Sequence, residues 1–212
     1  MELEPKNFLS VKGLFFSFEG IDGCGKTTQL KRFSLYLQQK NVPFICTREP
    51  GGNLVSEEIR KILLSSNFNI VPRCELLLFS ASRTQLCEEV IKPNLDKGIC
   101  VLCDRFYDST TAYQGYGRNF DYNLINQLNQ ISTDGLNPHI TFLFDLKPEI
   151  AKKRISRNFD RMENNSIEFF ERVRQGFLIQ ARNNLRYIVL DASKTEDEVY
   201  ANMIKSIEER IC

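Results

Sequence analysis

Five short apolar runs alternate along the chain with longer amphipathic stretches. The runs cover residues 14–18, 43–46, 99–103, 140–144 and 187–190. Apolar side chains recur at a spacing near 3.6 residues in seven other stretches, which are 26–40, 54–64, 74–91, 122–131, 148–157, 166–184 and 196–210. Continuous apolar strands alternating with amphipathic helices are typical of a parallel sheet covered on both faces. The pattern predicts an α/β fold, a three-layer, doubly wound, five-stranded parallel sheet.

Charged or glycine-rich segments follow the predicted strands. In chain order these tails are Thr47-Arg48-Glu49-Pro50-Gly51-Gly52, Asp104-Arg105, Asp145 and Asp191-Ala192-Ser193, and a glycine-rich loop follows the first strand. In open α/β sheets, ligands bind outside the carboxyl ends of the strands. No repeat, low-complexity stretch or Pro/Gly/Ser-rich linker divides the sequence, so we expect residues 1–212 to form a single domain.

The charge balance narrows the range of partners. The 212 residues include 28 Lys plus Arg and 27 Asp plus Glu, which gives a formal net charge of +1. A near-neutral chain gives no reason to expect nucleic acid or a membrane surface as a partner. The first residues lack a basic leader-like region, and the apolar run that begins at Val11 is too short to span a bilayer.

The cysteines indicate a reducing compartment. There are seven, an odd number, and they are scattered. Cys100 and Cys103 lie three residues apart in a predicted strand, so they should point to opposite faces of the sheet and serve as small core residues. With no second cysteine pair at zinc spacing, we expect a cytoplasmic protein.

Residues 20–27 carry the most specific chemistry. They read Gly20-Ile21-Asp22-Gly23-Cys24-Gly25-Lys26-Thr27, the spacing G-x-x-x-x-G-K-[ST] of a phosphate-binding loop (P-loop). The glycines allow the backbone to approach a phosphate, and the following helix directs its positive end at the same anion. Lys26 suits the β- and γ-phosphates, and the Thr27 hydroxyl suits Mg²⁺. A chance glycine-rich turn is the alternative, but a predicted strand before and helix after favour the P-loop.

Two further features suggest phosphoryl transfer. Asp104 follows four apolar residues, as does the second acidic motif that orients Mg²⁺ in P-loop enzymes; a helix N-cap is the alternative. Arg105 beside it offers a planar fork for a second phosphate. Residues 152–161 hold five cations, which on their own would indicate a solvated helix face. Beside a P-loop, they favour a mobile lid over about residues 152–165 that delivers an arginine to the transferred group.

These motifs together resemble the thymidylate kinase family, which phosphorylates dTMP to dTDP with ATP and Mg²⁺ on the P-loop nucleoside monophosphate kinase architecture. The resemblance runs from about residue 14 to the C-terminus. It rests on Phe18–Thr28, Thr47–Gly52, Leu78–Arg83, Asp104–Gly115 and Phe159–Glu163. The arginine-rich lid is similar to that of the bacterial type. The other main branch has a catalytic arginine within the P-loop, where this chain has Cys24, so the resemblance implies that the lid supplies this charge.

The resemblance implies a role for each matching position. The catalytic residues would be Lys26, Arg157, Arg105, Asp22 and Glu19, although outside the family Glu19 would be interpreted as a turn residue. The ATP site would comprise Gly20, Ile21, Asp22, Gly23, Cys24, Gly25, Lys26, Thr27, Thr28, Arg154 and Arg161. The dTMP site would comprise Arg48, Glu49, Phe79, Arg83, Arg105, Ser109, Thr110, Tyr113 and Gln114, with Arg60 a weaker candidate. Thr27 and Asp104 would hold Mg²⁺.

Some of these assignments depend on the family alone. On residue pattern, Phe79 would be interpreted as a core aromatic of a helix; the family implies that it stacks on thymine. Ser82 stands where the family often has Asp or Asn before the arginine. His139 is the only histidine, and we expect it at the surface or at a strand edge.

The stretch 74–91 carries more apolar surface than one helix face needs, at Leu76, Leu77, Leu78, Leu86 and Val90. It could therefore pack on a partner helix, and in this family that helix forms a homodimer.

Two other functions remain open. One is a kinase for another nucleoside monophosphate. The other is a non-catalytic nucleotide-binding switch, although no Asn-Lys-x-Asp guanine motif is present.

Overall fold

The computed structural model describes residues 13–156, 160–182 and 184–211. Its centre is one parallel sheet with the strand order β2-β3-β1-β4-β5. The strands are β1 (Phe15–Glu19), β2 (Phe44–Arg48), β3 (Cys100–Asp104), β4 (Ile140–Asp145) and β5 (Tyr187–Asp191). The connection after β1 leads past β3 to the edge strand β2, and the connection after β3 leads past β1 to β4. The direction of winding therefore changes beside β1, where ligands bind in such sheets.

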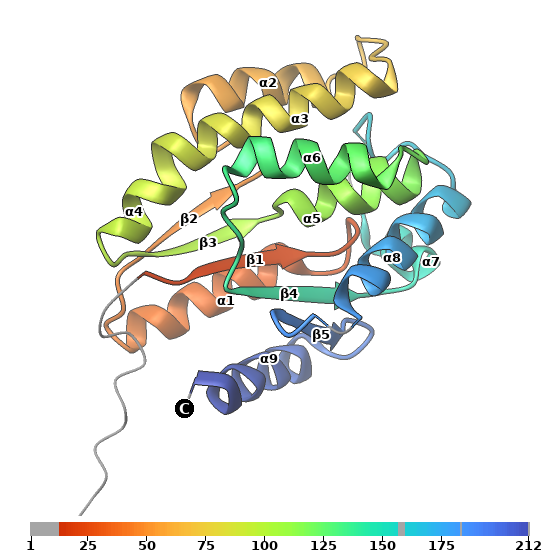
Figure 1. Ribbon diagram of the computed structural model, residues 1–212. Coiled ribbons are helices and arrows are strands. Elements are labelled where there is room, and N and C mark those ends of the chain that lie inside the picture. Colours follow the sequence, from red (N-terminus) through yellow and green to blue (C-terminus); the bar gives the residue numbers. More distant parts are fainter. Residues whose placement is uncertain (1–12, 157–159, 183, 212) are drawn as a thin grey trace, which may run out of the picture.

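Helices cover both faces of the sheet. They are α1 (Lys26–Gln39), α2 (Leu54–Leu64), α3 (Pro72–Leu86), α4 (Lys92–Asp96), α5 (Tyr107–Thr110), α6 (Tyr122–Thr133), α7 (Pro148–Arg154), α8 (Ile167–Ala181) and α9 (Glu196–Ile211), with π-helical segments η1 (Cys87–Ile91) and η2 (Thr111–Gly117). Figure 1 shows α1 and α9 on one face and α2, α3 and α6 on the other. Among the described residues, no helix has the length and apolar character needed to cross a bilayer. The predicted three-layer, doubly wound fold is confirmed.

Alternating side chains of β1 build a core on each face of the sheet. Phe16 and Phe18 pack with Phe33 of α1, at ring-centroid distances of 5.2 and 6.1 Å. Phe15 points the other way and meets Phe106 edge-on at 4.8 Å. On β3, Cys100 belongs to the first core and Cys103 to the second. The prediction that these two cysteines occupy opposite faces is confirmed.

The structure differs from the expected elements in three places, one of which is α7, expected to reach residue 157 but ending at Arg154. The helix expected over 74–91 starts at Pro72 and continues through η1 into α4. Helical residues 107–117 were not expected, because Ser109, Thr110 and Thr111 have weak helix propensity. Tertiary contacts stabilise this segment: Asp108, fully buried, pairs with Arg186 just before β5 at 2.5 Å.

Candidate active site

The loop between β1 and α1 has the geometry of a P-loop. Gly20, Gly23 and Gly25 take φ values of 136°, 81° and 93°. A Cβ atom at Gly20 would lie 2.6 Å from the Phe144 carbonyl oxygen, and one at Gly23 would lie 2.4 Å from that of Ala151. Only glycine suits these conformations and close approaches. The loop therefore presents its backbone, rather than side chains, to an anion at the N-terminus of α1.

Thr27 and Asp104 are brought together by the sheet. Asp104 ends β3 and pairs in register with Phe18 of β1, one residue before β1 ends. The Thr27 hydroxyl donates to the Asp104 carboxylate at 3.1 Å. Both groups offer hard oxygen ligands beside the phosphate loop, and Mg²⁺ binds through one or two such ligands plus phosphate oxygens. Within the part of the chain that the structure describes, no group of three or more acidic, His or Cys side chains could hold a metal ion by itself. The pair fits a nucleotide-bound Mg²⁺.

Arg105 lies at the centre of the site. Its φ is 71°, a left-handed conformation that costs a non-glycine residue about 1–3 kcal/mol and that clusters at functional sites. The guanidinium donates to Asp22 at 2.6 Å, to the Gly20 carbonyl at 2.8 Å and to the Ser109 hydroxyl at 3.1 Å. It therefore contacts both the P-loop and the α5 segment.

The charges of Arg105 and Lys26 lower the pKa of Asp22. Burial alone would raise the pKa of Asp22, but the charges of Arg105 and Lys26 outweigh burial and hold that pKa well below its usual value. Asp22 is consequently a fixed anion between the P-loop and Arg105. Lys26 itself is buried under the loop and donates to the carbonyls of Gly20 and Ile21, each at 3.0 Å.

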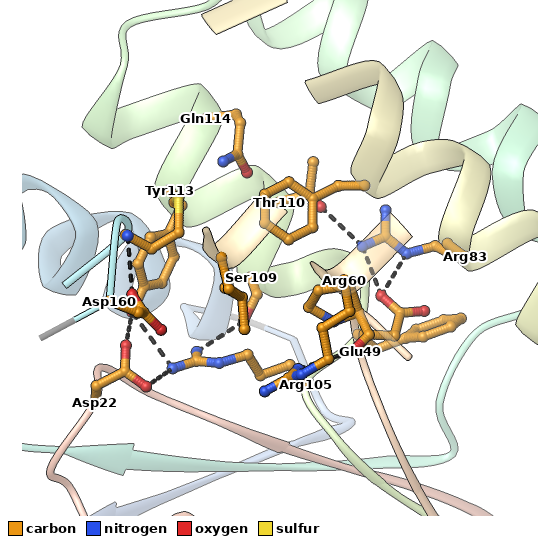
Figure 2. Close-up of a pocket in the computed structure, with 15 residues that line it drawn as sticks. Asp22, Glu49, Arg60, Arg83, Arg105, Ser109, Thr110, Tyr113, Gln114 and Asp160 are labelled. Carbon is orange, nitrogen blue, oxygen red and sulfur yellow. Dashed lines mark hydrogen bonds and ion pairs between the residues drawn. The ribbon is translucent and has the colours of Figure 1, made fainter. Parts of the chain in front are cut away.

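A cavity on the α3 side of Arg105 gathers most of the predicted dTMP residues (Figure 2). Eight of the nine line it: Glu49, Phe79, Arg83, Arg105, Ser109, Thr110, Tyr113 and Gln114. They come from the end of β2, from α3, and from the segment that runs from β3 through α5 into η2. We call this the acceptor cavity. Arg48, the ninth predicted residue, lines the neighbouring cavity and pairs with Glu57 at 2.9 Å.

Arg83 forms the polar end of the acceptor cavity. Its side chain is 1% exposed, and it binds one oxygen of Glu49 through two nitrogens at 2.9 and 2.7 Å. It also donates to the Thr110 hydroxyl at 2.8 Å. Burial raises the pKa of Glu49, partly offset by Arg83. The network holds the guanidinium rigidly, as a donor-only group at the cavity wall.

A second cavity, which we call the donor cavity, is lined by the P-loop. It contains residues 22–29 together with Arg48, Asp104, Arg154 and the start of α9. The guanidinium of Arg154 donates to the Ala192 carbonyl at 3.0 Å, beside this cavity. Four side chains line both cavities: Asp22, Glu49, Arg60 and Arg105. The two cavities therefore adjoin at the tip of β1, with two arginines and two acidic side chains at their junction.

Several predicted residues lie elsewhere than expected. Glu19, expected near the transferred phosphate or its metal, is fully buried and lines neither cavity. It accepts hydrogen bonds from the Phe106 N–H at 2.7 Å and from the Ser109 hydroxyl at 2.6 Å. Arg161, expected at ATP, lines neither cavity and instead pairs with Glu75 of α3 at 2.6 Å. Arg157, the expected catalytic lid arginine, lies outside the described residues.

Two P-loop positions have restricted roles. Ile21 is buried in the core, and only its backbone faces Lys26. Cys24 is 3% exposed, and burial raises the pKa of its thiol. Cys24 therefore adds no charge to the loop, in agreement with the expectation drawn from its sequence position.

Burial also sets the protonation of Glu19. Burial and, to a lesser degree, the charge of Asp108 raise the pKa of this carboxyl to about 8. A neutral Glu19 still binds Phe106 and Ser109, so it holds the segment that carries Arg105 rather than charging the cavities.

Sequence reasoning missed some residues. Leu64, Asp160 and Met162 line the acceptor cavity, and Lys194, Thr195 and Glu196 line the donor cavity. The tail after β5 pointed to the latter group. Asp160 and Met162 lie within the predicted lid, although no role at a base or phosphate was expected for them, and no pattern pointed to Leu64. Ser82 faces the loop after β2, where its hydroxyl accepts from the Gly51 N–H at 3.4 Å. His139 is exposed just before β4 and accepts from the Phe15 N–H at 2.9 Å, so the prediction that it lies at the surface or at a strand edge is confirmed by its exposure.

The fold and site define a class of protein. A P-loop at the switch point of a parallel sheet, adjoining a second cavity across an arginine, is the arrangement of a P-loop phosphotransferase with separate donor and acceptor sites.

Comparisons with known proteins specify the family. A thymidylate kinase family model matches residues 18–203. The chain is 45% identical over 192 residues to the thymidylate kinase of Carboxydothermus hydrogenoformans, covering 90% of this chain and 94% of that protein. It is 46% identical over 198 residues to that of Thermosipho africanus, covering 93% and 98%. The crystal structure of thymidylate kinase from Ehrlichia chaffeensis superposes with a TM-score of 0.74 at 38% identity, covering 92% of this chain and 98% of that chain. The chain belongs to the thymidylate kinase family, and it is a phosphotransferase.

Proposed function

We propose that this enzyme transfers the γ-phosphoryl group of ATP to the 5′-phosphate of dTMP, giving dTDP and ADP. The observation that carries the proposal is the junction of the two cavities at Arg105, with the P-loop on one side and eight residues expected at dTMP on the other. ATP would occupy the donor cavity and dTMP the acceptor cavity, so the reacting groups meet at the tip of β1.

Catalysis would depend on position and charge. The acceptor phosphate is already anionic, so no strong general base is needed. Arg105 would align the acceptor phosphate, and Lys26 would neutralise charge on the transferred group. Asp22 would keep Arg105 in place through their 2.6 Å contact. Arg157 remains our candidate for the lid arginine.

Mg²⁺ would be held by Thr27 and by Asp104, directly or through water. Bound there with ATP, Mg²⁺ would neutralise negative charge on the phosphates during transfer. The 3.1 Å contact of the Thr27 hydroxyl with the Asp104 carboxylate shows that the two oxygen ligands lie close together, which supports this assignment.

Selection of a thymidine nucleotide would come from the acceptor cavity. Phe79 would stack on the base, Arg83 would donate to a base carbonyl, and Thr110 and Gln114 would complete the polar contacts. Tyr113, 6% exposed, would pack under the deoxyribose and exclude a 2′-hydroxyl. Arg48 and Arg60 would assist at the phosphate.

We further propose a homodimer formed through α3. On this helix Leu76 and Leu86 are buried, whereas Leu77 is 51% exposed. An exposed leucine on a helix that already packs against α2 and α6 supports a partner at that face.

The six cysteines of the described residues are all free, which supports a cytoplasmic enzyme.

A coupled assay with ATP and a panel of acceptors tests the function. We expect turnover with dTMP to exceed that with dUMP, dCMP, dGMP and AMP, and Arg105→Met to lower kcat about 100-fold or more. Preference for another acceptor, or wild-type turnover by Lys26→Ala, would refute the proposal.

A further inference from the structure

Glu75 of α3 is a buried carboxylate that lines neither cavity. It is fully buried, yet four nitrogen atoms surround it. Gln114 donates its Nε2 at 2.9 Å, Arg161 donates at 2.6 Å, and Arg118 donates through two nitrogens at 3.4 Å. Two guanidinium groups compensate the buried charge. The third partner, Gln114, lines the acceptor cavity.

The contact with Glu75 determines which end of the Gln114 amide faces the cavity. A carboxylate between two arginines only accepts hydrogen bonds, so the amide must present its NH₂ group to Glu75. The amide oxygen Oε1 then faces the other way, and Figure 2 shows it directed into the ring of cavity side chains. Within residues 13–156, 160–182 and 184–211, no hydrogen bond to this oxygen is formed.

The cavity wall therefore presents a defined pattern to a base. Arg83 offers only donors, and Gln114 offers an acceptor to the same cavity. A base with a carbonyl next to an N–H group, as in thymine and uracil, matches this pattern. Cytosine has an amino group next to an unprotonated nitrogen and presents the reverse pattern.

We propose that Glu75 is a positioning residue for base selection, because it fixes the Gln114 amide with its oxygen toward the bound base. The proposal rests on the proposed function, since it takes the acceptor cavity as the site of the nucleotide base. Glu75 does not touch the substrate. It acts through Gln114, and its removal should change the preference among bases.

Glu75→Gln tests the proposal with minimal change in shape. The new amide should turn its single oxygen to Arg161, which forms the shortest contact, and its NH₂ group to Gln114. Gln114 would then rotate and present its own NH₂ to the cavity. Dissociation constants of dTMP, dUMP and dCMP, measured by calorimetry, give the selectivity. We expect the preference for dTMP over dCMP to fall at least about tenfold, the order lost when a polar pairing is broken, with dUMP weakened as much as dTMP.

Two further variants separate this role from general damage. Arg161→Met removes the other short contact of Glu75 but keeps the contact with Gln114, so we expect unchanged selectivity even where all three nucleotides bind more weakly. If Glu75→Gln does not fold, Gln114→Met carries the test and should lose the same selectivity. A fall of less than fivefold in the folded Glu75→Gln protein, or in Gln114→Met, would overturn the proposal. Failure of the wild type to bind dTMP would instead overturn the proposed function.

Discussion

At the scale of single residues, the sequence predicts the backbone conformations and contacts that a short motif requires. The positive φ values of Gly20, Gly23 and Gly25 follow from the P-loop spacing, since a Cβ would clash there. The partners of Glu19 could not be predicted, because Phe106 and Ser109 lie 87 and 90 positions away along the chain. Only the pairing of β1 with β3 brings them together.

Glu19 gives stability a specific pH dependence. Its pKa is about 8 when folded against an ordinary value of 4.5, so the folded protein retains a proton that the unfolded chain releases between these values. The stability from neutral Glu19 is complete below about pH 4.5 and is lost as pH rises through about 8. Glu19→Gln imitates the neutral form, so it should lose less stability than the wild type between about pH 5.5 and 8.5.

Urea unfolding midpoints at several pH values measure this difference. Glu58→Gln, at a side chain that is 70% exposed, serves as the control and should follow the wild type. Parallel curves for the wild type and Glu19→Gln would show that Glu19 is ionised throughout.

At the scale of elements, long amphipathic helices and apolar strands were predictable, and short helices were not. Helix α2 spans Leu54–Leu64, the bounds predicted from its periodicity. The segment α5–η2 carries Ser109, Thr110, Tyr113 and Gln114, yet it has no helical pattern of its own. Its conformation depends on buried contacts with β1 and with the start of β5.

In the lid region, too, the sequence pattern alone did not determine where the side chains lie. The sequence predicted a helix over 148–157 and a lid over about 152–165, but α7 ends at Arg154. Arg154 lies at the donor cavity, whereas Arg161 lies against Glu75 behind the acceptor cavity. Sequence spacing alone could not divide these arginines between two sites.

Because Arg154 lies at the donor cavity and Arg161 behind the acceptor cavity, we predict opposite kinetic effects when each is replaced by methionine. We expect Arg154→Met to raise KM for ATP about fivefold or more and to leave KM for dTMP nearly unchanged, because a charge-assisted contact near the donor is lost. Arg161→Met should do the reverse. Initial rates with each substrate varied in turn measure both effects. Equal changes in both KM values for either variant would contradict the division.

At the scale of the whole molecule, the strand order places the site. Because β1 lies between β3 and β4, the P-loop after β1 and Arg105 after β3 emerge side by side. The alternation of strands and helices predicted a doubly wound parallel sheet with ligands at the carboxyl ends of its strands, but not this strand order. The location of the acceptor cavity between α3 and η2 depended on packing that the pattern did not contain.

The proposed dimer can be tested on one exposed side chain. Leu77→Glu places a charge on the exposed face of α3 and should convert the dimer to a monomer at micromolar concentration, because burying an unpaired charge is costly. Sedimentation velocity measures the mass. Leu185→Glu is the control, since Leu185 is 90% exposed on the loop before β5. A monomeric wild type, or a Leu77→Glu protein that remains dimeric, would argue against the interface.

The central claim is that one donor cavity and one acceptor cavity adjoin at Arg105 for direct transfer. Adenosine and thymidine joined through five phosphates would span both cavities, and calorimetry with competition against each substrate measures how this compound binds. We predict one molecule per chain, competitive with both ATP and dTMP. Competition with only one substrate, or two molecules per chain, would contradict the claim.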